Sequence, residues 1–119
     1  MFDTIKITLA QLNPTVGDLN GNADKAFAAW EKSKESGADL VALPEMFITG
    51  YNAQDLISKP AFHTAAIETI QRLAEACAEG PALAIGGPWK EGDGVFNAYF
   101  ICQSGKIKSV VEKHHLPND

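Results

Sequence analysis

The chain has 119 residues, which is enough for one compact domain and too few for two. Its net charge of −5 disfavours nucleic acid or an anionic membrane as the main partner. The N-terminus fits neither a signal peptide nor a membrane span, and the two cysteines have no paired or metal-like spacing. We therefore expect a cytoplasmic protein without a disulfide framework, a bound metal or a membrane partner.

The first half of the chain alternates strand-like and helix-like patterns. Apolar residues alternate with polar ones over residues 5–11, which predicts a strand with one face more buried than the other. Asn22 is a candidate cap for a helix that ends at Gly37. An apolar run over residues 39–43 predicts the second strand. The helix expected between these two strands carries one apolar stripe, formed by Ala23, Ala26, Phe27 and Trp30.

The second half begins with another helix and ends in strands. Pro60 stands where a first-turn proline opens a helix, and the apolar spacing predicts that this helix runs to about Ala78. Residues 82–87, 95–102 and 106–113 predict three further strands joined by short turns.

This order of elements predicts an α/β fold with a mixed sheet. Strands that alternate with helices pair in parallel, whereas strands joined by tight turns pair antiparallel. Both helices can cover one face of the sheet. Residues 82–85 and 99–101 are apolar without alternation, so we expect the other face to be buried as well. The sequence does not obviously contain what covers that face.

Glu45 is the first candidate for chemistry, because it follows the carboxyl end of the second strand and is flanked by apolar residues. An enclosed carboxylate can act as a general base if a donor or a cation holds it. Lys113, at the end of the last strand, is the best candidate for that cation and could stabilise an oxyanion. The alternatives are that Glu45 is a loop acid that caps a neighbouring amide or pairs with a surface lysine, and that Lys113 is a solvated lysine.

Other reactive residues are weaker candidates. His114 and His115 are adjacent, and neighbouring side chains on an extended segment point in opposite directions, which disfavours a shared metal. Cys77 falls on the apolar stripe of the second helix, and Cys102 ends an apolar strand. Both patterns favour buried structural thiols over nucleophiles.

Four motifs in this order resemble one family. They are AQLNPTVGDLNGN, LVALPEMFITGY, IGGPW followed by FNAYF, and EKHHLPN. Together they resemble the opening half of the nitrilase, or carbon-nitrogen hydrolase, superfamily, and within it the glutaminase domains of bacterial glutamine-dependent NAD synthetases. The resemblance implies the first half of an α/β/β/α sandwich. It also implies a Glu-Lys-Cys triad that hydrolyses amides, with Glu45 as general base, Lys113 as stabiliser of the tetrahedral intermediate and Tyr51 in the glutamine pocket.

The same resemblance sets expectations for a parent enzyme. Its cysteine nucleophile lies downstream of the lysine motif, so residues 1–119 are expected to be part of a glutaminase domain and inactive alone. The missing half of the domain and a separate synthetase domain, which uses ATP and Mg²⁺ to amidate deamido-NAD with the released ammonia, would be its partners. We expect the parent to be a homo-oligomer. The alternatives are a fragment of a stand-alone amidase and a non-catalytic binding domain.

Overall fold

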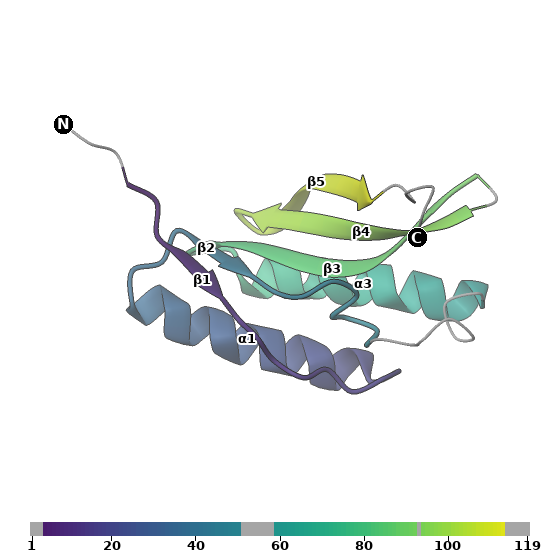
Figure 1. Cartoon of the computed structure of the whole chain (residues 1–119), viewed down its shortest axis with the longest axis horizontal. Helices are drawn as coiled ribbons and strands as arrows, with labels where there is room; N and C mark the ends of the chain where they lie inside the picture. The colour runs from purple at the N-terminus through teal and green to yellow at the C-terminus, as the bar shows by residue number, and fades with distance from the viewer. Residues whose placement is uncertain (1–3, 51–58, 93, 114–119) are drawn as a thin grey trace, which may run out of the picture.

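The computed structural model describes residues 4–50, 59–92 and 94–113. Two helices lie against one face of a five-stranded sheet whose strands follow the order β1-β2-β3-β4-β5 (Figure 1). The elements are β1 (Ile7–Leu9), α1 (Leu19–Glu35), β2 (Leu40–Ala42), α3 (Pro60–Ala76), β3 (Ala82–Glu91), β4 (Gly94–Gln103) and β5 (Lys106–Lys113). The chain therefore forms two layers, helices and sheet, as the sequence predicts.

The sheet is mixed, which confirms the predicted topology. β1 pairs in parallel with β2 and β2 with β3, while β3, β4 and β5 form antiparallel pairs. β3 continues beyond the predicted residue 87 because its pairing with β4 runs on to Glu91. The pairing of β3 with β2 stops at Ala84. Pro88, which has no backbone N–H, therefore lies in a part of β3 that pairs with β4 and no longer with β2.

Helix α1 begins earlier than the sequence pattern indicates. Asp18 is the N-cap residue, and its carboxylate accepts a hydrogen bond from the Gly21 amide at 3.0 Å. Asn22 is therefore not the cap; it lies one turn inside the helix and is fully buried. The prediction was wrong because both residue types cap helices well, and the cap falls on the residue whose carboxylate reaches the first-turn amide. Pro60 opens α3, as predicted.

The core lies between the helices and the sheet. Val41, Leu83, Ile85 and Phe100 contribute fully buried side chains from three strands. Trp30 of α1 packs at the edge of this core, and its indole N–H donates to the Pro81 carbonyl at 2.8 Å. Neither described helix combines the length and the apolar character that crossing a membrane requires.

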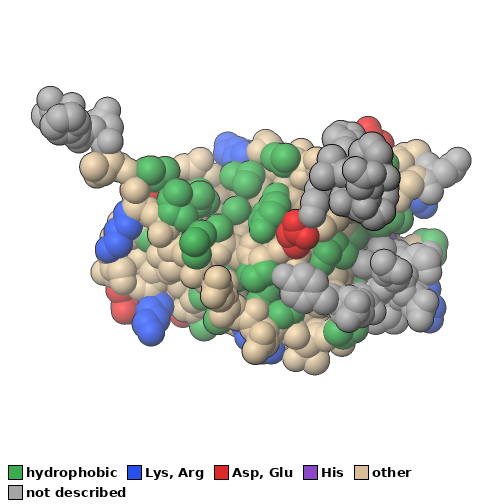
Figure 2. Space-filling view, viewed as in Figure 1, with side chains coloured by type: hydrophobic (Ala, Val, Ile, Leu, Met, Phe, Trp, Pro, Cys, Tyr) green, Lys and Arg blue, Asp and Glu red, His purple; other side chains and the backbone are tan. Residues whose placement is uncertain are grey.

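The opposite face of the sheet is rich in exposed apolar side chains. Figure 2 shows hydrophobic side chains gathered on this face, over the strands that Figure 1 draws in front of the helices. Leu9 on β1 is 72% exposed and Val111 on β5 is 57% exposed. Soluble proteins rarely leave such a surface uncovered. We call this surface, formed by Ile7, Leu9, Tyr99 and Val111 among others, the open face.

Candidate functional site

Glu45 lies in a turn that follows β2 at the open face. The chain remains attached to β3 on both sides of the turn, because the Leu43 amide donates to the Ala84 carbonyl at 2.8 Å and the Ile48 amide donates to the Gly86 carbonyl at 3.1 Å. Met46 has a φ of 52°, a backbone conformation that residues other than glycine rarely adopt. The turn closes where the Gly50 amide donates to the Met46 carbonyl at 2.9 Å.

Gly86 on β3 allows the Glu45 turn to lie directly on the sheet. A Cβ atom at this glycine would be 2.3 Å from the Met46 nitrogen, 2.7 Å from the Pro44 oxygen and 2.8 Å from the Glu45 carbonyl carbon. All three are backbone atoms, so they cannot move aside as a flexible side chain would. Because glycine has no side chain, Gly86 sets how closely the Glu45 backbone approaches the sheet.

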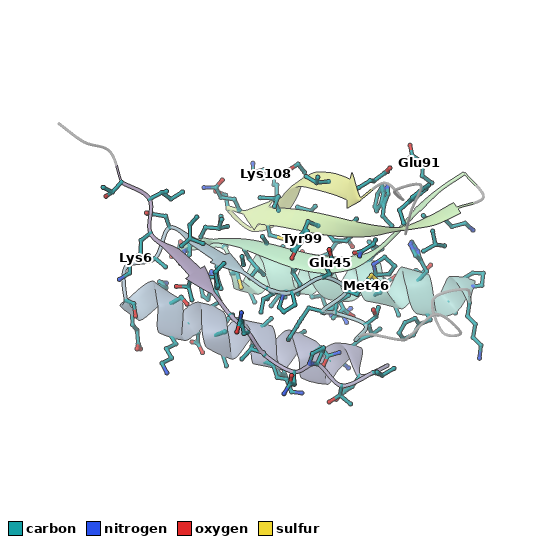
Figure 3. The ribbon with its side chains drawn as sticks, in the orientation of Figure 1. Lys6, Glu45, Met46, Glu91, Tyr99 and Lys108 are labelled. Carbon is teal, nitrogen blue, oxygen red and sulfur yellow. The ribbon has the colours of Figure 1, made fainter. Side chains whose placement is uncertain are left out.

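Two side chains of β4 hold the same turn from the open face. Ala98 and Phe100 belong to the core on the helix side, so the alternation along β4 directs Asn97 and Tyr99 to the open face. The Tyr99 hydroxyl donates to the Leu43 carbonyl at 2.9 Å, and the Asn97 amide nitrogen donates to Glu45 Oε2 at 3.2 Å. Figure 3 labels Glu45 and Tyr99 beside each other over the middle of the sheet.

Glu45 is half-buried among groups of mixed character. An acidic side chain lies near the middle of the open face among hydrophobic ones (Figure 2), and Figure 3 labels Glu45 at that place. Two of the three apolar residues that follow Glu45 do not enclose it as the sequence suggested. Phe47 and Ile48 are fully buried in the core, where a Cβ added at Gly87 would come 3.0 Å from Ile48 Cγ2. A hydrogen bond from Asn97 of β4 holds the carboxylate.

The structure brings the backbone of Lys113 to the Glu45 site. Lys113 is the last residue of β5 and the register partner of Asn97, the residue that donates to Glu45. The backbone of Lys113 is thus paired with the strand residue that donates a hydrogen bond to Glu45. The side chain of Lys113 lies outside the described part of the structure, as do Tyr51, His114 and His115.

A buried amide supports the Glu45 turn from the helix side. Asn22 is fully buried, and its side-chain nitrogen donates to the carbonyl oxygens of Thr15 at 2.8 Å and Ile48 at 3.0 Å. Its oxygen accepts from the Thr15 amide at 2.7 Å. The Gly17 amide adds a bond to the Thr49 carbonyl at 2.9 Å. The loop before α1 and the turn after β2 are therefore fastened together.

Both cysteines of the chain are buried in the core, as predicted. Burial raises the pKa of the Cys77 thiol from 9.0 to about 12, with further contributions from Cys102 and Glu31. Burial also raises the pKa of the Cys102 thiol, to about 11. A thiol held neutral within the core is a poor nucleophile. Neither cysteine can attack a substrate beside Glu45 on the open face.

Asn97, Tyr99, Gly86 and Asn22 were not among the site residues predicted from the sequence. Asn97 carried a recognisable signal, because it is the one amide in the apolar run VFNAYFIC and amides are disfavoured within strands. Gly86 and Asn22 carried no sequence signal that distinguishes them from ordinary turn or cap residues. Their roles depend on which segments the fold brings together.

Comparisons with known sequences agree with this geometry. The carbon-nitrogen hydrolase family matches residues 6–119. The chain is 53% identical over 119 residues to a glutamine-dependent NAD(+) synthetase of Rhodobacter capsulatus, covering all of this chain and 22% of that protein. It is 33% identical over 114 residues to a protein of the same name from Thermotoga maritima, covering 96% of this chain and 20% of that protein. The chain thus spans about a fifth of the length of these relatives.

Comparison with solved structures gives the same grouping. The fold superposes with a TM-score of 0.89 and 28% identity on the crystal structure of a glutamine-dependent NAD(+) synthetase from Cytophaga hutchinsonii, covering 98% of this chain and 20% of that one. An amidase from Nesterenkonia, 24% identical with a TM-score of 0.75, shares the fold. The superposition covers 94% of this chain and 43% of the amidase.

Proposed function

The chain belongs to the carbon-nitrogen hydrolase family, and from that premise we propose that it forms the opening part of a domain that hydrolyses the amide of glutamine and supplies ammonia for NAD synthesis. The observation that supports the proposal is that one residue, Asn97, connects the Glu45 side chain with the backbone of Lys113. Asn97 donates to the Glu45 carboxylate and is the register partner of Lys113. A carboxylate and a lysine that are connected through one strand residue suit acyl transfer better than a structural role.

The proposed chemistry assigns one task to each residue. Glu45 accepts the proton of an attacking thiol, and the thiolate adds to the amide carbonyl of glutamine. The positive charge of Lys113 stabilises the oxyanion of the tetrahedral intermediate. Glu45 then gives the proton to the leaving nitrogen as the carbon-nitrogen bond breaks, so that ammonia is released and a thioester remains. Water then hydrolyses the thioester to give glutamate. Tyr51 is proposed to contact the glutamine substrate.

The attacking thiol is proposed to come from outside these 119 residues. Both cysteines within them are buried in the core, and their raised pKa values hold them neutral. We therefore propose that residues 1–119 are inactive by themselves and supply two of the three triad members. The exposed apolar side chains of the open face support the same view, because a neighbouring layer would enclose Glu45 and exclude water from the site.

The wider assignment follows from the named relatives. Because they are glutamine-dependent NAD(+) synthetases, we propose that the ammonia passes to a synthetase domain that uses ATP and Mg²⁺. We also propose a cytoplasmic, homo-oligomeric enzyme that takes neither nucleic acid nor membrane as a partner. The net charge of −5 and the two unpaired buried cysteines support that setting.

The proposal is tested with the complete product of the gene. Ammonia release from glutamine is measured first, and then NAD formation from deamido-NAD, ATP and glutamine. We expect both reactions, with glutamine preferred over simple aliphatic amides. Hydrolysis of aliphatic amides without hydrolysis of glutamine would instead assign the chain to a stand-alone amidase. Absence of any amide hydrolysis would contradict the catalytic proposal.

A further inference from the structure

Asn97 connects the Glu45 turn to a strand that is paired on both sides. Its strand, β4, is bonded on both sides, and Asn97 itself lies in register with Pro88 of β3 and Lys113 of β5. A residue paired on two sides has little freedom of backbone movement. The side-chain amide of Asn97 therefore extends from a fixed position toward Glu45, 52 residues away in the chain.

The hydrogen bond between the two side chains has one orientation. The nitrogen of Asn97 is 3.2 Å from Glu45 Oε2, and an ionised carboxylate accepts hydrogen bonds but donates none. The amide nitrogen must therefore face the carboxylate. This bond fixes the side-chain torsions of Glu45, whereas Gly86 and Tyr99 fix the backbone around it.

A neutral donor suits a general base better than a cation does. A hydrogen bond to the charged form of a carboxylate favours ionisation, so Glu45 remains ready to accept a proton at neutral pH. A lysine or arginine in the place of Asn97 would favour the ionised form more strongly and would lower the basicity that proton transfer needs. The amide orients Glu45 without adding a positive charge to the site.

The residue type at this position is difficult to explain by folding alone. Asn97 is flanked along β4 by Phe96, Ala98 and Tyr99, and valine or threonine would suit a paired strand better than asparagine. The described structure gives its side chain one hydrogen bond to a carboxylate, and that carboxylate is the candidate base. A residue that is poor for the strand but bonded to Glu45 is better explained by the site than by the sheet.

We propose that Asn97 is a positioning residue for amide hydrolysis: it orients the Glu45 carboxylate and keeps it ionised for proton transfer. The inference rests on the proposed function of Glu45 and adds a residue that acts through it. Because Lys113 is the register partner of Asn97, the same strand position connects the base with the backbone of Lys113.

The test is the pH dependence of kcat/KM for ammonia release from glutamine, measured with the complete gene product. Asn97→Leu retains the size of the side chain and removes the donor. Asn97→Asp retains the shape and places a second carboxylate next to Glu45. Gln103→Ala, which removes an exposed amide from the same strand, is the matched control. Circular dichroism and thermal unfolding check the fold of each variant.

We expect kcat/KM to fall about 10- to 100-fold in Asn97→Leu, because a hydrogen bond to a charged group is lost. The acid limb of the profile should move to higher pH, since Glu45 loses a contact that favours its ionised form. In Asn97→Asp the limb should move further, by about one pH unit or more, because two neighbouring carboxylates resist simultaneous ionisation. Gln103→Ala should retain the wild-type profile.

An acid limb that stays in place in folded Asn97→Leu would overturn the inference, even if activity falls. If Asn97→Asp fails to fold, the pH profile of Asn97→Leu alone decides whether Asn97 positions Glu45. Loss of the fold in both variants would make Asn97 a structural residue and would also overturn the inference. A wild-type protein that releases no ammonia from glutamine would instead refute the proposed function, and the role of Asn97 with it.

Discussion

Gly86→Ala tests whether the close contact between β3 and the Glu45 turn sets the position of the base. The added Cβ would lie 2.3 Å from the Met46 nitrogen, whereas ordinary contacts of a Cβ atom begin at 3.4 Å. The turn must therefore move outward by about 1 Å, because the atoms that the methyl group meets are backbone. A displacement of that size is enough to cost about 100-fold in a reaction that depends on a positioned base.

The neighbouring glycine is the matched control. A Cβ at Gly87 would meet the ends of three side chains in the core, with Ile48 and Ile70 at 3.0 Å and Phe100 at 3.2 Å. Overpacking of this kind costs about 1–3 kcal/mol of stability. We expect both variants to unfold at lower denaturant concentration than the wild type. Gly86→Ala alone should also lower kcat/KM for ammonia release from glutamine by about two orders of magnitude.

The two measurements separate the position of the base from the stability of the protein. Denaturant unfolding gives the change in stability for each variant, and glutamine hydrolysis by the complete gene product gives the change in activity. Full activity in a folded Gly86→Ala protein would refute the reasoning. An equal loss of activity in Gly87→Ala would show that core packing, and not the contact at Gly86, controls the site.

Two further predictions concern buried groups. Asn22→Ala should lower the free energy of unfolding by about 1–3 kcal/mol, because the carbonyl oxygens that Asn22 bonds lose a buried donor. The control is Asn20→Ala, which changes an exposed asparagine on the same helix and should alter the free energy of unfolding little. Equal effects of the two substitutions in urea unfolding would contradict the role of Asn22. The raised pKa values of Cys77 and Cys102 keep both thiols protonated in the folded protein, while those of the unfolded chain ionise above about pH 9. Their contribution to stability is therefore complete below pH 9 and decreases as the pH rises to about 11 for Cys102 and about 12 for Cys77. Both thiols should react slowly with iodoacetamide at pH 8 until the protein is denatured, and fast labelling of the folded protein would contradict their burial.

The order and type of the elements could be predicted because each has a strong local pattern. The strand over residues 106–113 has the predicted bounds, and Pro60 begins α3 as expected. The bounds of β1 and β2 could not be predicted, because only Ile7–Leu9 and Leu40–Ala42 find partners in the sheet. A strand ends where its neighbour ends, and the sequence of one strand does not contain that information.

The candidate site was partly predictable for the same reason. Glu45 stands out because it follows a buried strand, and Lys113 because it ends another. Asn97 and Gly86 act through contacts between segments that lie far apart in the sequence. Only the pairing of β3, β4 and β5 brings them to the turn, so residue type alone could not identify them. Their roles follow from the register of the sheet.

The role of Glu45 as the general base is tested most directly by Glu45→Gln in the complete gene product. The substitution retains the size of the side chain and removes the group that accepts a proton. Glu91→Gln, at an exposed acid on β3 (Figure 3), is the matched control. We predict that Glu45→Gln folds and lowers kcat for ammonia release from glutamine by about 100- to 10,000-fold, while the control retains wild-type activity. Wild-type ammonia release by folded Glu45→Gln would contradict the account.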